Sequence, residues 1–231
     1  MSRLRILIVD DEPTIVKFVR ANLEANDFET LGATDGAEAL QTIERELPDL
    51  LILDIMMPQM DGFEVCRRLR EWSQIPIIVL SALGDVSDKV KCLGLGADDY
   101  ITKPFSLDEL MARVRSVFRR AQTVDTIPTQ PSFTSGELQI NFAGRQVTVA
   151  GSEVRLTPTE YSLLQELVLN AGKVLTHTHL LSRVWGPMYE EEREYLRVFI
   201  GRLRAKLEPD PTNPGYIITV PGVGYQFKHT V

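Results

Sequence analysis

The hydrophobic pattern of the first half of the chain repeats one short apolar run followed by one longer amphipathic segment. The apolar runs are typical of strands buried in a parallel sheet. The predicted strands are Leu4–Val9, Phe28–Ala33, Leu50–Asp54, Ile77–Ser81 and Asp99–Thr102. Asp35 and Asp61 are predicted helix N-caps, and Ser106 with Glu109 forms a capping-box pattern. Five strands alternating with five helices predict an α/β domain with a (βα)5 doubly wound parallel sheet.

The pattern changes near residue 121. Gln122–Ser132 has no hydrophobic period and contains two prolines, as expected of a linker. The elements predicted beyond it are short and of mixed type. We therefore expect one domain over residues 1–121, a linker over 122–132 and a second, α+β domain over 133–231.

The second domain is predicted to contain short strands, three helices and a hairpin. The strands are expected at Leu138–Asn141, Gln146–Val149 and Val154–Leu156. Thr157 and Glu160 form a capping box, with Pro158 at the first helical position, and begin a helix that ends near Leu169. The remaining elements are helices at about Thr178–Trp185 and Glu192–Leu207 and a hairpin of Tyr216–Val220 and Tyr225–Lys228.

The composition is typical of a soluble globular protein. Hydrophobic residues make up 44% of the 231 residues and charged residues 25%. No apolar run reaches the roughly 18 residues that a membrane span requires, and the first residues do not resemble a secretory signal. Cys66 and Cys92 lie outside any metal-binding pattern, so we expect free thiols, no structural zinc, no membrane attachment and a cytoplasmic location.

The net charge of −7 is unevenly distributed. Residues 1–121 contain 15 Lys and Arg against 21 Asp and Glu, whereas residues 122–231 contain 10 against 11. Arg193–Lys206 alone holds five basic residues and one acidic residue. The local field of a segment decides its attraction to a phosphate backbone, so this predicted helix is the candidate nucleic-acid contact.

Three acids and a lysine fall at the carboxyl ends of predicted strands. Asp10 and Asp11 follow the first strand, Asp54 ends the third, and Lys103 follows the fifth. Ligands of a parallel sheet bind at this edge, where the four side chains should converge. Crowded carboxylates repel each other unless a cation lies among them, and Mg²⁺ prefers such oxygen ligands. Asp54 is then placed as a nucleophile toward a phosphoryl group.

These residues lie in the motifs LIVDDE, LILDIMMPQMDG, IVLSA and ADDYITKPF. Together, the motifs resemble the receiver domain of response regulators over residues 3–120. The resemblance implies that a sensor histidine kinase phosphorylates Asp54. It also implies that Asp11, Asp54 and the Met56 carbonyl oxygen bind Mg²⁺ directly, and that Asp10 acts through water.

The same resemblance assigns roles to residues of the fourth and fifth strands. Ser81 would hydrogen-bond one phosphoryl oxygen, and Lys103 would pair with another. Tyr100 would be the switch aromatic, and Pro104 would follow a cis peptide bond.

Charges of both signs on the fourth helix, fifth strand and fifth helix predict a dimer interface. In the resembled family, this face pairs two phosphorylated receivers into a homodimer. The implied cross-pairs are Lys89–Glu109, Asp98–Arg115 and Asp99–Arg113. A two-fold interface is self-complementary, so both signs must be available on one patch.

The helix predicted at Glu192–Leu207 has one apolar stripe, and its opposite face holds small residues edged by arginines. Such a face suits the major groove of DNA, although charge patterning alone is equally typical of a solvated surface helix. We expect Arg202 and Val198 to reach base edges and Arg197 and Arg204 to reach phosphates. Tyr195 lies near Arg202 on the expected contact face.

The stretch LTPTEYSLLQELVLNAGKVLTHTHLLSRVWG, with LRVFIGRLRAKLE and YIITVPGVGYQF, resembles the winged-helix effector of OmpR/PhoB-type regulators over about residues 133–229. The resemblance implies that Tyr195–Leu207 is the recognition helix and that Pro221–Tyr225 is the wing tip. A narrower likeness is to the Kdp potassium-transport regulators. We expect binding to directly repeated promoter sites and, through the acidic loop before the recognition helix, contact with RNA polymerase.

Three other classes of function remain open from the residues alone. A catalytic effector would need a constellation that the second half lacks, since His177 and His179 have no acidic or Cys companions nearby in sequence. A phosphorylation-independent DNA binder would not need the acidic triad, and an interaction adaptor would not need the basic helix. We therefore expect a transcription regulator and not an enzyme, apart from the receiver's own phosphoryl transfer and slow dephosphorylation.

Overall fold

The computed structural model describes residues 3–122 and 131–229. Two compact units are present, Met1–Val117 and Phe118–Val231, and the division between them falls within a helix. Most of the predicted linker lies outside the described residues. At its ends, Gln122 is the last residue of a helix and Ser132 is the first residue of a strand.

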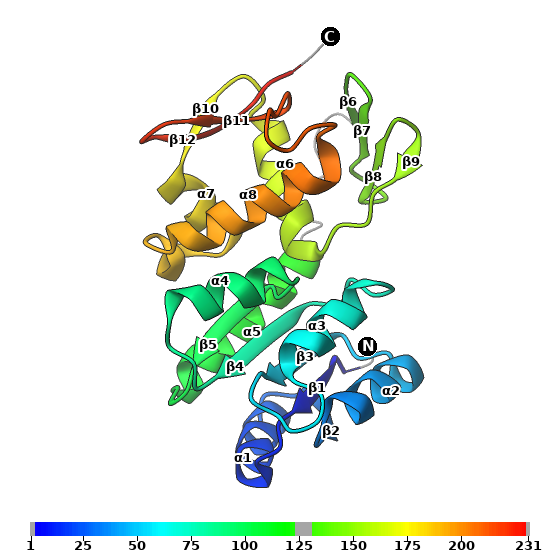
Figure 1. The fold of residues 1–231 in the computed structure, drawn as a ribbon, viewed down its shortest axis with the longest axis vertical. Coiled ribbons are helices and arrows are strands. Elements are labelled where there is room, and N and C mark those ends of the chain that lie inside the picture. The colour runs from blue at the N-terminus through cyan, green and yellow to red at the C-terminus, as the bar shows by residue number, and fades with distance from the viewer. Residues whose placement is uncertain (1–2, 123–130, 230–231) are drawn as a thin grey trace. The chain divides into compact units, whose positions relative to one another are not determined.

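The first unit is a five-stranded parallel sheet flanked by helices on both faces (Figure 1). The strands are β1 (Arg5–Val9), β2 (Glu29–Ala33), β3 (Leu50–Asp54), β4 (Ile77–Ser81) and β5 (Asp99–Thr102). The helices are α1 (Pro13–Glu24), α2 (Gly36–Glu46), α3 (Gly62–Arg70), α4 (Val86–Gly94) and α5 (Leu107–Gln122). The strand order β2-β1-β3-β4-β5 confirms the predicted doubly wound sheet.

Local sequence signals explain where these elements form. Every residue of β3 and β4 is buried, as expected of central strands covered on both faces. Asp35 caps α2 and Asp61 caps α3, each by accepting backbone hydrogen bonds in the first turn. The strand order reverses between β1 and β3, and in such sheets this switch point is where ligands bind.

The second unit combines a small sheet, three α-helices and a second sheet (Figure 1). The antiparallel sheet consists of β6 (Ser132–Ser135), β7 (Leu138–Asn141), β8 (Gln146–Val149) and β9 (Ser152–Glu153). The helical elements are α6 (Pro158–Leu169), α7 (His177–Val184), the 3-10 turn η1 (Pro187–Tyr189) and α8 (Arg193–Leu207). The last sheet, ordered β10-β12-β11, consists of β10 (Val174–Thr176), β11 (Ile217–Val220) and β12 (Gly224–Phe227).

The helices and hairpin of the second unit confirm the winged-helix prediction, including the Thr157–Glu160 capping box with Pro158 at its start. The strand predicted at Val154–Leu156 is wrong, because those residues form no strand and only the two-residue β9 precedes them. The pattern also missed β6 and β10. β10 has only three residues, too few for a periodic signal, and β6 begins at Ser132, the last residue of the predicted linker.

An aromatic cluster forms part of the second core. Trp185 packs edge-on against Phe199, with ring centroids 5.1 Å apart, and Tyr189 packs against Tyr195 at 5.7 Å. All four side chains are buried. The cluster fixes the first half of α8 against α7 and η1, and thereby determines which face of α8 points outward.

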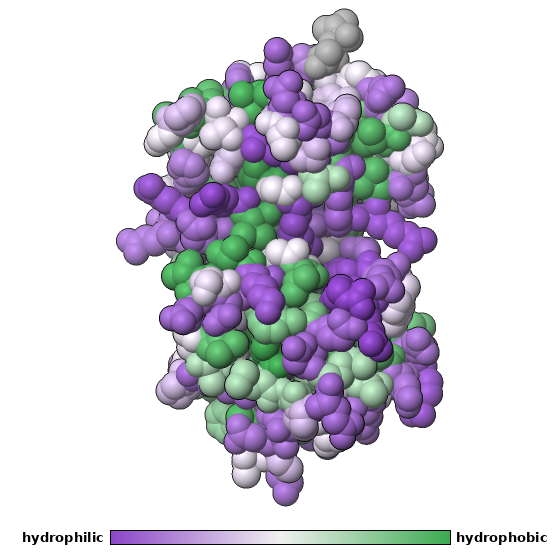
Figure 2. Space-filling view, viewed as in Figure 1, coloured by the Kyte–Doolittle hydropathy of each residue, from purple (hydrophilic) through white to green (hydrophobic). Residues whose placement is uncertain are grey.

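None of the helices in the described residues is both long and apolar enough to cross a membrane. Hydrophilic residues are distributed over both units on the face that Figure 2 shows, interspersed with smaller apolar areas.

Candidate functional site

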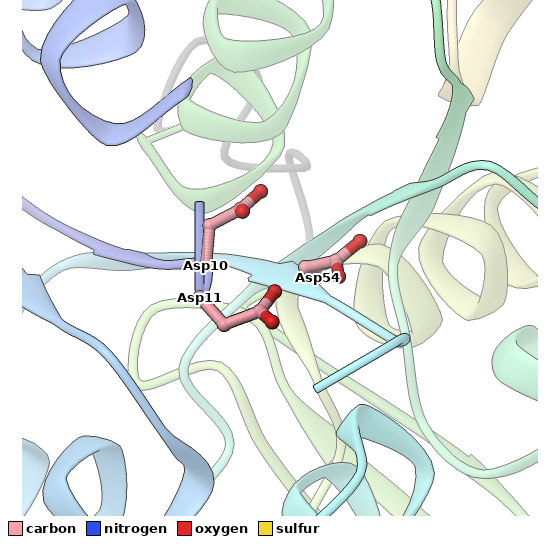
Figure 3. Close-up of side chains that lie close together, drawn as sticks. All are labelled: Asp10, Asp11 and Asp54. Atoms are coloured by element: carbon pink, nitrogen blue, oxygen red, sulfur yellow. The ribbon is translucent and has the colours of Figure 1, made fainter. Parts of the chain in front are cut away.

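The strand ends of the first unit gather three carboxylates. Asp10 and Asp11 directly follow β1, and Asp54 is the last residue of β3, the strand beside it. One carboxylate oxygen from each residue lies within 4.8 Å of the others (Figure 3). Asp10 and Asp54 are buried, whereas Asp11 is exposed at the mouth of the cluster. This convergence is the one that the strand-end positions predict.

Lys103 lies among these acids. Its Nζ atom is 2.8 Å from Asp10 Oδ2 and 3.0 Å from Asp54 Oδ1. The Lys103–Pro104 peptide bond is cis, as predicted. Lys103 follows β5, so its side chain must cross the edge of the sheet to reach β1 and β3. The pocket therefore combines oxygen ligands with one cationic side chain, a composition suited to binding a phosphoryl group.

Burial sets the electrostatics of the pocket. The side chain of Asp54 is only 4% exposed, and burial raises its pKa above the ordinary value, although Lys103 partly lowers it. For Lys103, burial alone would lower the pKa. Its hydrogen bonds to Asp10 and Asp54 outweigh that effect and raise the pKa, so the ammonium group stays charged.

The other expected pocket residues surround Asp54. Met56 N donates a hydrogen bond to Asp54 Oδ2 at 3.1 Å, while the Met56 side chain is exposed. Ser81 is buried at the end of β4, where its Oγ atom accepts a hydrogen bond from Leu83 N at 3.1 Å. The hydroxyl of Tyr100 is turned inward and donates to the Leu83 carbonyl oxygen. A single loop after β4 thus contacts both Ser81 and Tyr100.

The structure corrects two residues of the expected dimer face. The Asp98 side chain is fully buried and pairs with Arg70 at 3.0 Å, so it is not available to Arg115 of a second protomer. Asp99 is also fully buried and pairs with Arg113 of the same chain at 2.9 Å. Asp98 directly precedes β5 and Asp99 is its first residue, and each acid is paired with an arginine of the same chain.

The other members of that expected face are accessible to different degrees. Lys89, Glu109 and Arg113 are half-buried, and Arg115 is exposed. Glu109 forms an ion pair with Arg113 one helical turn away, at 2.9 Å. These four residues keep charges of both signs on α4 and α5.

On α8, the outward face consists of the residues that avoid the aromatic core. Gly201 and Ala205 are exposed, Val198 is half-buried, and the Arg197 side chain is 78% exposed. A Cβ atom at Gly201 would meet nothing within 4 Å. The face therefore has the small residues that close approach to a duplex requires, with an exposed arginine at its edge, 3.9 Å from the Glu194 carboxylate.

Two residues expected on the DNA-contacting face are elsewhere. Tyr195 is fully buried in the aromatic cluster. Arg202 has a side chain only 10% exposed, and its Nε lies 2.8 Å from Glu160 Oε1. Glu160 also pairs with Lys206 at 2.7 Å. The helical pattern placed Arg202 on the outward face, but its long side chain turns toward a buried acid that the sequence identified only as part of a capping box.

Arg204, expected at a phosphate, contacts the protein instead. Its guanidinium donates hydrogen bonds to the Ile217 carbonyl oxygen and to Thr219 Oγ1 in β11. The basic excess of α8 is therefore largely internal. Of its five cations, Arg202, Arg204 and Lys206 hold neighbouring elements, whereas Arg193 and Arg197 are exposed.

Comparison with known families agrees with this architecture. The family model described as response regulator receiver domain matches residues 6–115, and that described as transcriptional regulatory protein, C terminal, matches residues 151–227. A receiver sheet with an acidic pocket, together with a winged-helix DNA-binding domain, defines a two-component response regulator. Such a protein is a regulator of transcription and not an enzyme.

Curated relatives match nearly the whole chain. KdpE of Mycobacterium tuberculosis (strain CDC 1551 / Oshkosh) is 44% identical, over 96% of this chain and 98% of its own length. The KDP operon regulator KdpE of Escherichia coli (strain K12) is also 44% identical, with the same coverage. The probable transcriptional regulator ycf27 of Porphyridium aerugineum is 45% identical, over 99% of this chain and 97% of its own.

Solved structures give the same result. The response regulator DrrB, an OmpR/PhoB homologue of Thermotoga maritima, is 32% identical with a TM-score of 0.53, over 98% of this chain and 100% of its own. A RitR mutant is 27% identical with a TM-score of 0.79, over 98% and 99%. The chain belongs to the OmpR/PhoB-type response regulators.

Proposed function

We propose that a sensor histidine kinase phosphorylates this regulator at Asp54 in the cytoplasm, and that the phosphorylated form dimerises and binds directly repeated promoter sites. The single observation that supports phosphorylation most strongly is the buried Asp54 carboxylate, held between two further acids and the Lys103 ammonium group. The likeness to KdpE along the chain supports potassium-transport genes among its targets. The ycf27 relatives are equally similar, so promoter binding decides between these assignments.

Asp54 would be the nucleophile of the phosphoryl transfer. A carboxylate oxygen of Asp54 forms the new bond to phosphorus as the bond from phosphorus to the kinase imidazole nitrogen breaks. Lys103 would pair with one oxygen of the transferred group, and Ser81 would donate a hydrogen bond to another. For this step, Lys103 must release one of the two carboxylates that it contacts now.

Mg²⁺ is the cofactor that fits this pocket. Carboxylate oxygens are its preferred protein ligands, and three of them lie within 4.8 Å of one another. Asp11 and Asp54, with the Met56 carbonyl oxygen, would hold the ion directly, and Asp10 would do so through water. When bound, Mg²⁺ neutralises charge on the phosphoryl oxygens.

Labelling with acetyl phosphate tests the pocket. The wild-type chain should gain one phosphoryl group in the presence of Mg²⁺ and none in its absence, as measured by intact-protein mass spectrometry. Asp54→Asn should not be labelled. Asp61→Asn, which keeps the cap of α3, is the matched control and should be labelled normally. Equal labelling of Asp54→Asn and the wild type would show that the phosphoacceptor is another residue.

Dimerisation is proposed to use the α4 and α5 face that carries Lys89, Glu109, Arg113 and Arg115. Sedimentation velocity should show a monomer before phosphorylation and a dimer afterwards. Lys89→Glu should weaken the dimer, and adding Glu109→Lys should restore it by exchanging the two charges. Persistence of the monomer after full phosphorylation would contradict this proposal.

DNA binding is proposed to use the outward face of α8, with Val198 against base edges and Arg197 against a phosphate. Half-sites should lie about one helical turn apart, roughly 10–11 base pairs. Footprinting of the phosphorylated chain on upstream DNA of potassium-transport genes should show two direct repeats. A palindromic footprint would contradict the head-to-tail arrangement.

RNA polymerase is a further proposed partner. The loop before α8 exposes Met188 together with the acids Glu190 and Glu191. An acidic surface next to a DNA-binding helix is repelled by the duplex and is therefore better suited to a protein partner. Replacing Glu190 and Glu191 with Gln should lower transcription in vitro without weakening promoter binding. Equal loss of both activities would assign the loop to DNA.

A further inference from the structure

The end of α8 holds both backbone groups of Ile217, the first residue of β11. Glu208, which follows α8, accepts a hydrogen bond from Ile217 N at 2.8 Å and others from the two preceding backbone amides. Arg204 donates to the Ile217 carbonyl oxygen from Nε at 3.0 Å and from Nη2 at 2.6 Å. Arg204 Nη2 also donates to Thr219 Oγ1 at 2.8 Å.

We call the side chains of Arg204 and Glu208 the clamp, because together they form hydrogen bonds with both backbone groups of Ile217 in β11. The two residues are one helical turn apart, so both project toward the same strand. Glu208 is buried and Arg204 is half-buried. Hydrogen bonds with a charged partner are stronger than neutral ones, particularly where water is excluded. The clamp therefore fixes β11 against α8.

The other strand of the hairpin is tied to a different helix. β12 pairs with β10, and β10 runs directly into α7. A Cβ atom at Gly224 would lie 1.9 Å from the Leu175 carbonyl oxygen, so these two strands approach as closely as glycine allows. The hairpin is thus attached through β12 to α7 and through β11 to α8.

The hairpin of β11 and β12 has no basic side chain that would attract it to DNA. Residues 217–227 contain neither Lys nor Arg, and Pro221, Gly222 and Val223 at the tip are exposed. Any contact that this tip makes with a duplex must come from its backbone and apolar surface. The position of the tip is then set by its attachments to α7 and α8, because the tip has no charge that would attract it to the phosphates over a long range.

We propose that Arg204 and Glu208 are positioning residues for DNA binding, which set the spacing between the recognition face of α8 and the wing tip. This inference rests on the proposed function, in which the outward face of α8 meets the duplex. It replaces the phosphate contact expected of Arg204. It also means that the wing adds affinity that is independent of salt, because docking the wing releases no counterions.

The test measures the affinity of the full phosphorylated chain over a series of salt concentrations. The probe is a labelled duplex selected by the wild-type chain from a randomised library. Arg204→Lys keeps the charge but cannot hold Ile217 and Thr219 together. Glu208→Gln removes a negative charge, which by electrostatics alone would strengthen binding. Both should instead bind about tenfold more weakly, equivalent to about 1.4 kcal/mol, with an unchanged salt slope.

Controls separate positioning from stability and from charge. Arg155→Lys and Glu153→Gln, on exposed parts of the same unit, should bind as the wild type does. Circular-dichroism melts define a temperature at which every variant is folded, and affinities are compared there. Hydroxyl-radical protection of the minor groove facing the wing should be lost in both clamp variants, while methylation protection of the major groove should persist.

Three results would overturn the clamp. The first is wild-type affinity of Arg204→Lys, and the second is tighter binding by Glu208→Gln. The third is a salt slope for Arg204→Ala that is flatter by about 0.9, the change expected when one phosphate contact is lost. Arg197→Ala tests the proposed function separately and should flatten the slope by that amount. If it changes nothing while the clamp variants bind weakly, Arg197 is not the phosphate contact of the proposed function, and the positioning role of Arg204 and Glu208 stands.

Discussion

Glu160 Oε1 lies 2.8 Å from Arg202 Nε, which joins the first turn of α6 to the middle of α8. The Glu160 side chain is fully buried, and its other oxygen lies 2.7 Å from Lys206 Nζ. The same carboxylate accepts a hydrogen bond from Thr157 N, as the capping box requires. One acid therefore completes the capping box of α6 and also orients α8, the proposed recognition helix.

Removing Glu160 should strongly destabilise the second unit. In Glu160→Leu, the largely buried cation of Arg202 loses the Glu160 carboxylate, and removing one member of a buried ion pair costs about 3–5 kcal/mol. Urea unfolding followed by Trp185 fluorescence, in a Trp72→Phe background, measures the free energy of unfolding. Glu166→Leu, at a more exposed ion pair of α6, is the comparison and should cost less. If Glu160→Leu lowered the free energy of unfolding by less than about 1 kcal/mol, which is typical of surface ion pairs, the structural role of Glu160 would be contradicted.

Asp54→Asn should stabilise the first unit in the absence of divalent cations. The substitution removes one buried charge from three crowded carboxylates and leaves Lys103 paired with Asp10. Functional sites commonly hold such unfavourable charges, and relieving one is expected to add about 0.5–2 kcal/mol to the free energy of unfolding. Thermal unfolding in EDTA provides the measurement, with Asp61→Asn as the control. Lower stability of Asp54→Asn would indicate that the pairing with Lys103 outweighs the repulsion.

The two thiols should be unreactive in the folded chain. Cys66 and Cys92 are fully buried, and burial raises the pKa of Cys92 from 9.0 to about 12. The thiolate is the reactive form, so Cys92 should resist a disulfide reagent such as DTNB even at pH 10. At that pH, the thiols of an unfolded chain are mostly ionised. Two thiols should react in urea and none in buffer. Rapid labelling of folded protein at pH 8 would contradict this burial.

Two glycines of the second unit should respond to alanine in opposite directions. Gly201→Ala places a Cβ atom in open space on α8 and should raise the free energy of unfolding by about 0.8–1.0 kcal/mol through helix propensity. Gly224→Ala places one against the Leu175 carbonyl oxygen and should lower it by about 1–3 kcal/mol. Urea unfolding of both variants tests the pair. Similar effects in both would mean that the surroundings of these glycines differ from those described.

The sequence by itself determined most of the elements and the acidic pocket. β3, β4 and β5 have the predicted bounds, and the hairpin of β11 and β12 lies where the Gly-rich turn indicated. Asp10, Asp54 and Lys103 were predictable as a group, because parallel strands present all their carboxyl ends at one edge of the sheet. In that situation, position along the chain is enough to fix position in space.

Tertiary structure alone decided which charged side chains face solvent. The helical period placed Arg202 on the outward face of α8 and Arg204 at the edge of its apolar stripe, but both guanidinium groups turn inward, to Glu160 and to β11 respectively. Asp98 and Asp99 are hidden in the same way by Arg70 and Arg113. A periodic pattern gives the direction of a Cα–Cβ bond, whereas the end of a long charged side chain goes to the nearest buried partner. That partner comes from a distant segment of the chain, so only the packed fold can identify it.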